Sequence, residues 1–165
     1  MPIDYFTNCK TNSSKIKFGI CDEQPPSTNP AYIDEDSPTE WIGIINNSSE
    51  KNIQFNAIDN CIDIRREDGK MDSRCDGLIS YENNLIFVEL KERDGGQWLK
   101  KGREQLTATI NRFKQEVDAT KYNSIKAYVC NRLRPQAHYG QATNIQKFKD
   151  DTGFTLFGKQ NINIE

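Results

Sequence analysis

The feature that most constrains this chain is a short apolar run, Leu85 to Val88, followed directly by Glu89-Leu90-Lys91. A continuous apolar run of this length predicts a strand buried on both faces, as in the centre of an α/β sheet. Because side chains alternate along a strand, Glu89 and Lys91 point to one face while Leu90 points to the other. The sequence therefore predicts a carboxylate and an ammonium side by side at the end of a buried strand.

A second acidic residue, Asp76, lies on the preceding strand of a predicted tight hairpin. A two-residue turn over residues 82–83 places Asp76 opposite Glu89. A turn over residues 83–84 places it opposite Lys91 instead. Either register brings two carboxylates and an ammonium together at one sheet edge, and like charges opposite each other destabilise a sheet. The hairpin therefore predicts a site that binds a cation.

The order Asp76, hairpin, Glu89-Leu90-Lys91, amphipathic helix resembles the PD-(D/E)XK nuclease superfamily, although Cys75 stands where many members have proline. The resemblance covers residues 53–134. It implies the restriction-endonuclease-like α/β fold, a three-layer α/β/α arrangement with a central mixed sheet of four to five strands. It also implies that Asp76, Glu89 and the backbone carbonyl of Leu90 hold Mg²⁺ or Mn²⁺.

These residues suit phosphodiester hydrolysis, with Asp76, Glu89 and Lys91 as the catalytic candidates. Two carboxylates suffice for Mg²⁺, because this ion prefers oxygen ligands and keeps several of its waters. Lys91 lies beside two carboxylates, so we expect it to stay charged and to act by electrostatic stabilisation more than as a general base. The resemblance adds Gln105 and Glu40 as auxiliary candidates, since some members carry a Gln on the following helix or a Glu on an amino-terminal helix.

Hydrophobic periodicity predicts the elements around the hairpin. A stripe from Leu99 to Val117 predicts a helix over residues 97–118, and the next strand, residues 124–130, should run parallel to residues 85–91. We further expect a strand at 15–21, a loop at 24–36, a short helix opened by a capping box at 37–40, a strand within 53–64, a helix at 144–151 and a terminal strand or hairpin at 154–164. The chain is predicted to be one domain, with an accessory part (1–50), a nuclease-like core (51–134) and a carboxy-terminal helix and strand (135–165).

Charge is unevenly distributed along the chain. Residues 1–60 hold 4 basic and 9 acidic side chains, whereas residues 91–134 hold 11 basic and 5 acidic ones. The basic excess fits a phosphate-binding flank, and it equally fits a helix face that lysines and arginines simply solvate. The candidates for nucleic-acid binding are Lys100, Lys101, Arg103, Arg112, Arg132 and Arg134.

Five cysteines without a Cys-x-x-Cys pair, and no secretion-type segment at the start, predict reduced, mostly buried thiols and a cytoplasmic location. The single histidine, His138, cannot form a zinc site alone. No apolar run approaches the roughly 20 residues that a membrane span needs.

The sequence therefore favours a metal-dependent nuclease, acting on DNA more than RNA, of the kind found in restriction, repair or anti-phage defence. The main alternative is a catalytically silent nuclease-fold module that binds protein or nucleic acid, which the pI of about 5.6 favours. An inhibitor or immunity protein would fit the acidity but leaves the charged trio unexplained. A protein partner that supplies targeting and a homodimer are both compatible with this reading, and no membrane partner is expected.

Overall fold

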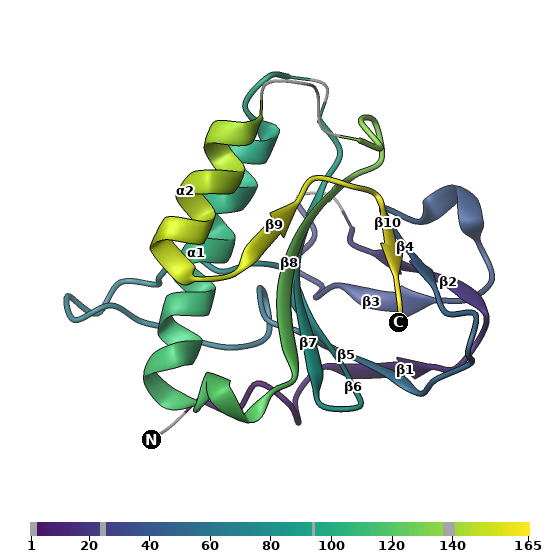
Figure 1. Cartoon of the computed structure of the whole chain (residues 1–165), viewed down its shortest axis with the longest axis horizontal. Helices are drawn as coiled ribbons and strands as arrows, with labels where there is room; N and C mark the ends of the chain where they lie inside the picture. Colours follow the sequence, from purple (N-terminus) through teal and green to yellow (C-terminus); the bar gives the residue numbers. More distant parts are fainter. Residues whose placement is uncertain (1–2, 24–25, 94, 137–140) are drawn as a thin grey trace.

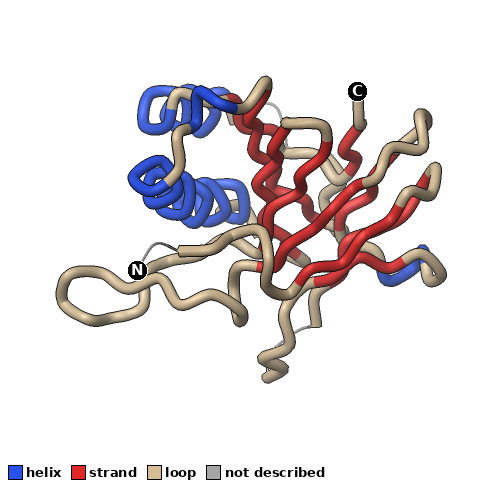
Figure 2. Tube along the Cα trace, turned by 90° about the horizontal axis from the view of Figure 1, so that it is seen from below, coloured by secondary structure: helices blue, strands red, loops and turns tan. Residues whose placement is uncertain are grey.

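The computed structural model describes residues 3–23, 26–93, 95–136 and 141–165, which form two mixed sheets and two α-helices (Figures 1 and 2). The larger sheet has the strand order β1-β5-β6-β7-β8-β9, and the smaller one has the order β10-β4-β2-β3. The larger sheet contains β1 (Lys10–Ser13), β5 (Ile53–Ala57), β6 (Gly77–Tyr81), β7 (Asn84–Lys91), β8 (Ser124–Asn131) and β9 (Thr155–Phe157). The smaller sheet contains β2 (Lys17–Cys21), β3 (Tyr32–Asp34), β4 (Gly43–Asn46) and β10 (Asn161–Asn163). The helices are α1 (Trp98–Glu116) and α2 (Ala142–Thr152), and 3-10 turns span Pro38–Glu40 and Ala119–Lys121.

The predicted hairpin, helix and parallel strand are confirmed. Strands β5, β6 and β7 form an antiparallel meander, and α1 then crosses over to β8, which runs parallel to β7. Tyr81 pairs with Asn84, so the turn is the two-residue one over Glu82 and Asn83. Both turn residues have positive φ, 42° and 64°, as a tight hairpin turn whose twist matches its strands requires. The register that places Asp76 opposite Glu89 is therefore the one adopted.

The larger sheet is covered by helices on one face and by the smaller sheet on the other (Figure 1). Side chains that alternate along β7 contribute to the cores on both faces of the larger sheet. Leu85 and Phe87 pack in the core beneath α1. Ile86, Val88 and Leu90 pack in the core against the smaller sheet. The α/β class is thus correct. The predicted α/β/α layering is wrong, because a second sheet occupies the place of the second helical layer, and the central sheet has six strands rather than four to five.

The second sheet also explains the errors at the two ends of the chain. The capping-box helix predicted to begin at Ser37 is only a 3-10 turn, in which Ser37 makes no side-chain cap hydrogen bond, and the chain continues into β4. Ile42 and Ile45 instead pack in the core between the sheets. At the other end, β9 and β10 do not pair as a hairpin, since β9 extends the larger sheet and β10 joins β4 in the smaller one.

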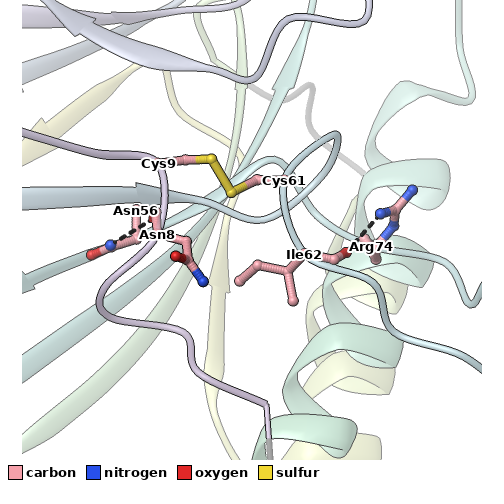
Figure 3. The surroundings of a disulfide bond; sticks show 6 residues. All are labelled: Asn8, Cys9, Asn56, Cys61, Ile62 and Arg74. Carbon is pink, nitrogen blue, oxygen red and sulfur yellow. Dashed lines mark hydrogen bonds between the residues drawn. A yellow bond between two sulfur atoms is a disulfide. The ribbon is translucent and has the colours of Figure 1, made fainter.

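A disulfide between Cys9 and Cys61 contradicts the expectation that all five cysteines are reduced (Figure 3). It ties the segment before β1 to the turn that follows β5. Cys21, Cys75 and Cys130 are free and buried. Disulfides are typical of oxidising compartments, so the cysteines no longer support the predicted cytoplasmic location. Within the described residues, no helix has both the length and the hydropathy to cross a bilayer.

Candidate active site

The site lies where β6 and β7 separate at the end of the hairpin opposite its turn. Gly77 pairs with Val88, so Asp76 and Glu89 continue the register on the face toward α1, although β6 itself begins only at Gly77. Gly77 permits this close packing, because a Cβ atom there would lie 2.1 Å from the Phe55 ring. The fold therefore places two acidic side chains next to each other at a sheet edge.

Backbone groups fix both carboxylates. The Leu90 amide donates to Asp76 Oδ2 at 2.7 Å, and the Asp76 amide donates to Glu89 Oε1 at 3.1 Å. Both side chains are buried, with Asp76 7% and Glu89 3% exposed. These reciprocal hydrogen bonds satisfy buried carboxylates in the way that such groups require, and they hold the two residues in one arrangement.

Lys91 links this pair to the helix. Its Nζ lies 2.9 Å from Glu89 Oε2 and donates to Gln105 Oε1 at 2.7 Å. Gln105 belongs to α1, whose apolar residues Leu106 and Ile110 anchor the helix on the sheet. The auxiliary candidate Gln105 therefore contacts the catalytic candidate Lys91, through its side-chain amide oxygen.

Asp76, Glu89, Lys91 and Gln105 line a cavity of about 190 Å³. Its wall contains six carboxylates and two cationic side chains, together with Leu90 and Gln105. The lining residues are Asp22, Glu23, Asp59, Asp76, Glu89, Leu90, Lys91, Glu92, Arg93 and Gln105. The cavity is thus lined mainly by acidic residues, with Lys91 and Arg93 as its two cationic side chains.

Burial and mutual repulsion shift the titration of the acids in this cavity. Burial raises the pKa of Asp76 well above its usual range, and the nearby Glu89 carboxylate raises it further. Burial also raises the pKa of Glu89, although Lys91 opposes the shift. The pKa of Asp22 rises to about 7, because this carboxyl is partly buried and lies near Asp76 and Asp59. Without a bound cation these carboxyls are therefore harder to ionise than ordinary ones, and a cation bound between them would favour their ionised form.

Asp22 is one of the cavity residues that sequence reasoning missed. It directly follows β2, so it reaches the cavity from the smaller sheet, whose existence was not predicted. The signal in the sequence was a charged residue at the end of an apolar strand. Asp59 also reaches the cavity. Its amide donates to the Cys75 carbonyl and its carboxylate lies 3.1 Å from Arg74.

We compared the chain with protein-family models, with curated proteins and with solved structures. None of them matches it. The PD-(D/E)XK resemblance therefore depends on the motif residues and on their order along the chain.

The predicted nucleic-acid-binding residues do not gather at the cavity. Arg103 is buried and donates to Asn144, Arg112 donates to the Arg65 carbonyl, and Arg132 pairs with Glu92 and donates to the Thr39 carbonyl. Lys100 and Lys101 are exposed on α1. Arg134 lies beyond the end of β8, and of the described residues that line the cavity none is one of these six. Arg93, which was not singled out, does line it.

Glu40 lines an adjoining cavity of about 270 Å³ rather than the site itself. The two cavities share Asp22, Glu23 and Glu92 in their walls. Glu40 is therefore a neighbour of the site, one cavity away from Asp76. His138 falls outside the described residues.

The donor groups fit a hard divalent cation in kind, because all of them are oxygen atoms. Asp76 and Glu89 supply carboxylates. The N–H and C=O of one strand residue lie on the same side of the strand, so the Leu90 carbonyl faces the side of Asp76, to which its amide donates. Among the described residues, no three His, Cys, Asp or Glu side chains are grouped as a metal site. An ion held here would therefore take its remaining ligands from the Leu90 carbonyl and from water.

Proposed function

We propose that this chain is a metal-dependent nuclease that hydrolyses phosphodiester bonds, with DNA as its preferred substrate. The observation that carries the proposal is the convergence of Asp76, Glu89, Lys91 and Gln105 on one cavity. The PD-(D/E)XK resemblance supports it, because the same residue types occur here in the same order of hairpin, strand and helix. A cluster of buried acids with raised pKa values is also more typical of functional sites than of surface ion pairs.

In this proposal Asp76, Glu89 and the Leu90 carbonyl hold Mg²⁺ or Mn²⁺. Such an ion neutralises phosphate charge and acidifies a bound water. The Leu90 amide keeps Asp76 oriented, and the Asp76 amide does the same for Glu89. These contacts fix the carboxylates before any ligand arrives, which limits the reorganisation that binding would need.

Lys91 supplies the positive charge on the protein side. Gln105 accepts a hydrogen bond from its ammonium, so Lys91 has a second anchor besides Glu89. An ammonium held in this way can stabilise the negative charge that develops on the phosphate oxygens. Gln105 is accordingly a positioning residue for Lys91.

The test is a cleavage assay on single- and double-stranded DNA and RNA with Mg²⁺, Mn²⁺, Ca²⁺ or a chelator. We expect DNA cleavage with Mg²⁺ or Mn²⁺ and none with the chelator. The Asp76→Asn variant should lose cleavage, while Asp150→Asn, an exposed change on α2, should retain it. Cleavage that survives both the chelator and Asp76→Asn would refute the proposal.

The second candidate is a nuclease-fold module that binds without cleaving. The observation that favours it is the acidity of the wall, since six carboxylates repel a phosphate backbone when no metal neutralises them. The same assay separates the two, because a silent module gives a stable complex with no product at any metal concentration.

A further inference from the structure

Thr109 connects helix α1 to the backbone that carries Asp76. It is fully buried, and its Oγ1 accepts a hydrogen bond from the Cys75 amide at 2.8 Å. The same hydroxyl donates to the Gln105 carbonyl at 3.0 Å. A single side chain therefore joins the residue before Asp76 to the helical turn that carries Gln105.

The Cys75 amide needs this partner. Cys75 is fully buried, and it lies just outside β6, where the strand has begun to leave the hairpin. On its other side the backbone is held by the segment that follows β5, since the Asp59 amide donates to the Cys75 carbonyl and the Ile58 amide donates to the Asp76 carbonyl. Thr109 thus fixes this segment from the side of the helix.

Gln105 and Thr109 are four residues apart, so they lie on one face of α1. From that face Gln105 contacts Lys91 and Thr109 contacts Cys75. One turn of α1 is therefore hydrogen-bonded to both ends of the candidate site: to Lys91 directly, and to Asp76 through the preceding residue, Cys75.

We propose that Thr109 is a positioning residue, which sets the place of the Asp76 carboxylate relative to Glu89 and Lys91. Its effect on cleavage rests on the proposed nuclease function. Its effect on geometry does not, because the Leu90 amide donates to Asp76 and reports where that carboxylate lies.

The matched control is Thr107, on the same helix. Its hydroxyl also donates to a carbonyl four residues earlier, that of Arg103, at 2.7 Å. Thr107→Val and Thr109→Val therefore remove the same kind of helical side-chain contact. Of the two, Thr109→Val alone removes the acceptor for Cys75. Thr109→Ser keeps that hydroxyl and serves as the rescue variant.

The experiment is amide hydrogen exchange by NMR on the native chain and the three variants, without metal. The internal reference is Ile86, which lies on β7 like Leu90 and pairs with Ile79 of β6. We expect Thr109→Val to speed Leu90 exchange relative to Ile86 by about tenfold or more, the effect of leaving a buried amide unpaired. Thr109→Ser and Thr107→Val should leave that ratio within about twofold of native.

A purely structural role predicts another result, namely that Leu90 and Ile86 speed up together as global stability falls. That outcome, or an unchanged ratio in Thr109→Val, would overturn the proposal. If Thr109→Val does not fold, the native chain still tests the proposal. The Cys75 amide must then exchange as slowly as the Ile86 amide, and fast exchange of the Cys75 amide overturns the proposal.

Cleavage provides the second readout. At saturating Mg²⁺ and DNA, the single-turnover rate of Thr109→Val should fall about tenfold or more, and Thr109→Ser should restore it. If the native chain cleaves nothing, the proposed function fails, while the Leu90 exchange ratio still tests Thr109. If Leu90 responds as expected but cleavage does not, Thr109 does not position the catalytic group and the proposal is overturned.

Discussion

Removing the Cys9–Cys61 disulfide should destabilise the fold by an amount that its position predicts. The bridge closes a loop between residues separated by 52 positions. In the chain-entropy model, a loop of that length corresponds to about 4 kcal/mol of stability at 25 °C, through restriction of the unfolded chain. For a chain of this size, about 4 kcal/mol corresponds to a fall in melting temperature of about 8–16 °C.

The assay is urea unfolding and thermal unfolding of the native chain and of Cys9→Ser/Cys61→Ser, each with and without reductant. The native chain with reductant should unfold like the double variant, and reductant should leave the double variant unchanged. Thiol titration of the denatured, unreduced native chain should find the three free cysteines. Five titratable thiols, or equal stability of the native chain and the double variant, would refute the reasoning.

The candidate site should survive this change at temperatures below the new melting point. Asp59 lies two residues before Cys61. The hydrogen bond from its amide to the Cys75 carbonyl and its ion pair with Arg74 do not involve the disulfide. Arg74 also donates to the Ile62 carbonyl (Figure 3), which holds the turn from its other side. We therefore expect the reduced, folded chain to keep most of the cleavage activity that we propose for the native chain.

Two further predictions concern the acidic cavity. Asp76→Asn keeps an acceptor for the Leu90 amide but removes a buried charge, so the metal-free variant should melt at or above the native temperature. Mg²⁺ should raise the melting temperature of the native chain and of Asp150→Asn, and should leave Asp76→Asn unchanged; equal shifts in all three would show that the ion binds elsewhere. Stability should also depend on pH. Because the pKa of Asp22 is raised to about 7, and those of Asp76 and Glu89 are raised too, the folded chain binds protons more tightly than the unfolded chain. This tighter proton binding contributes stability that is fully present at pH values below the ordinary pKa of a carboxyl group. The contribution is lost as the pH rises through about 7, the raised pKa of Asp22. Metal-free protein should therefore melt at least about 3 °C lower at pH 8 than at pH 5, the effect of about 1 kcal/mol, and a melting temperature that rises over this range would contradict the argument.

The hairpin shows what local sequence determines. The apolar run and the alternation predicted that Glu89 and Lys91 share a face, but two turn positions remained open. The structure selects the turn over residues 82–83, in which Glu82 has a positive φ of 42°. Glutamate rarely adopts that conformation, so composition could not choose this turn. The tertiary pairing of β6 and β7 overrides the local preference of one residue.

Non-local pairing explains most of the remaining differences. The smaller sheet joins β2 and β4 to β10, which is more than 100 residues away in sequence, and its strands have only three to five residues. Short strands carry little periodic signal, so the run containing Ile42 and Ile45 fitted a helix as well as a strand. Asp22 was missed for the same reason. The disulfide was missed because a count of cysteines does not determine their pairing.

The most direct test of the central claim is the single-turnover cleavage rate of Lys91→Ala at saturating Mg²⁺, measured against the native chain. Lys17→Ala, an exposed change at the start of β2, is the matched control. Loss of an electrostatic stabiliser at a reacting phosphate should lower the rate about 100- to 1,000-fold while DNA affinity changes little. Lys17→Ala should cleave like the native chain. Equal rates for Lys91→Ala and the native chain would contradict the account, because Lys91 would then be only the ion-pair partner of Glu89.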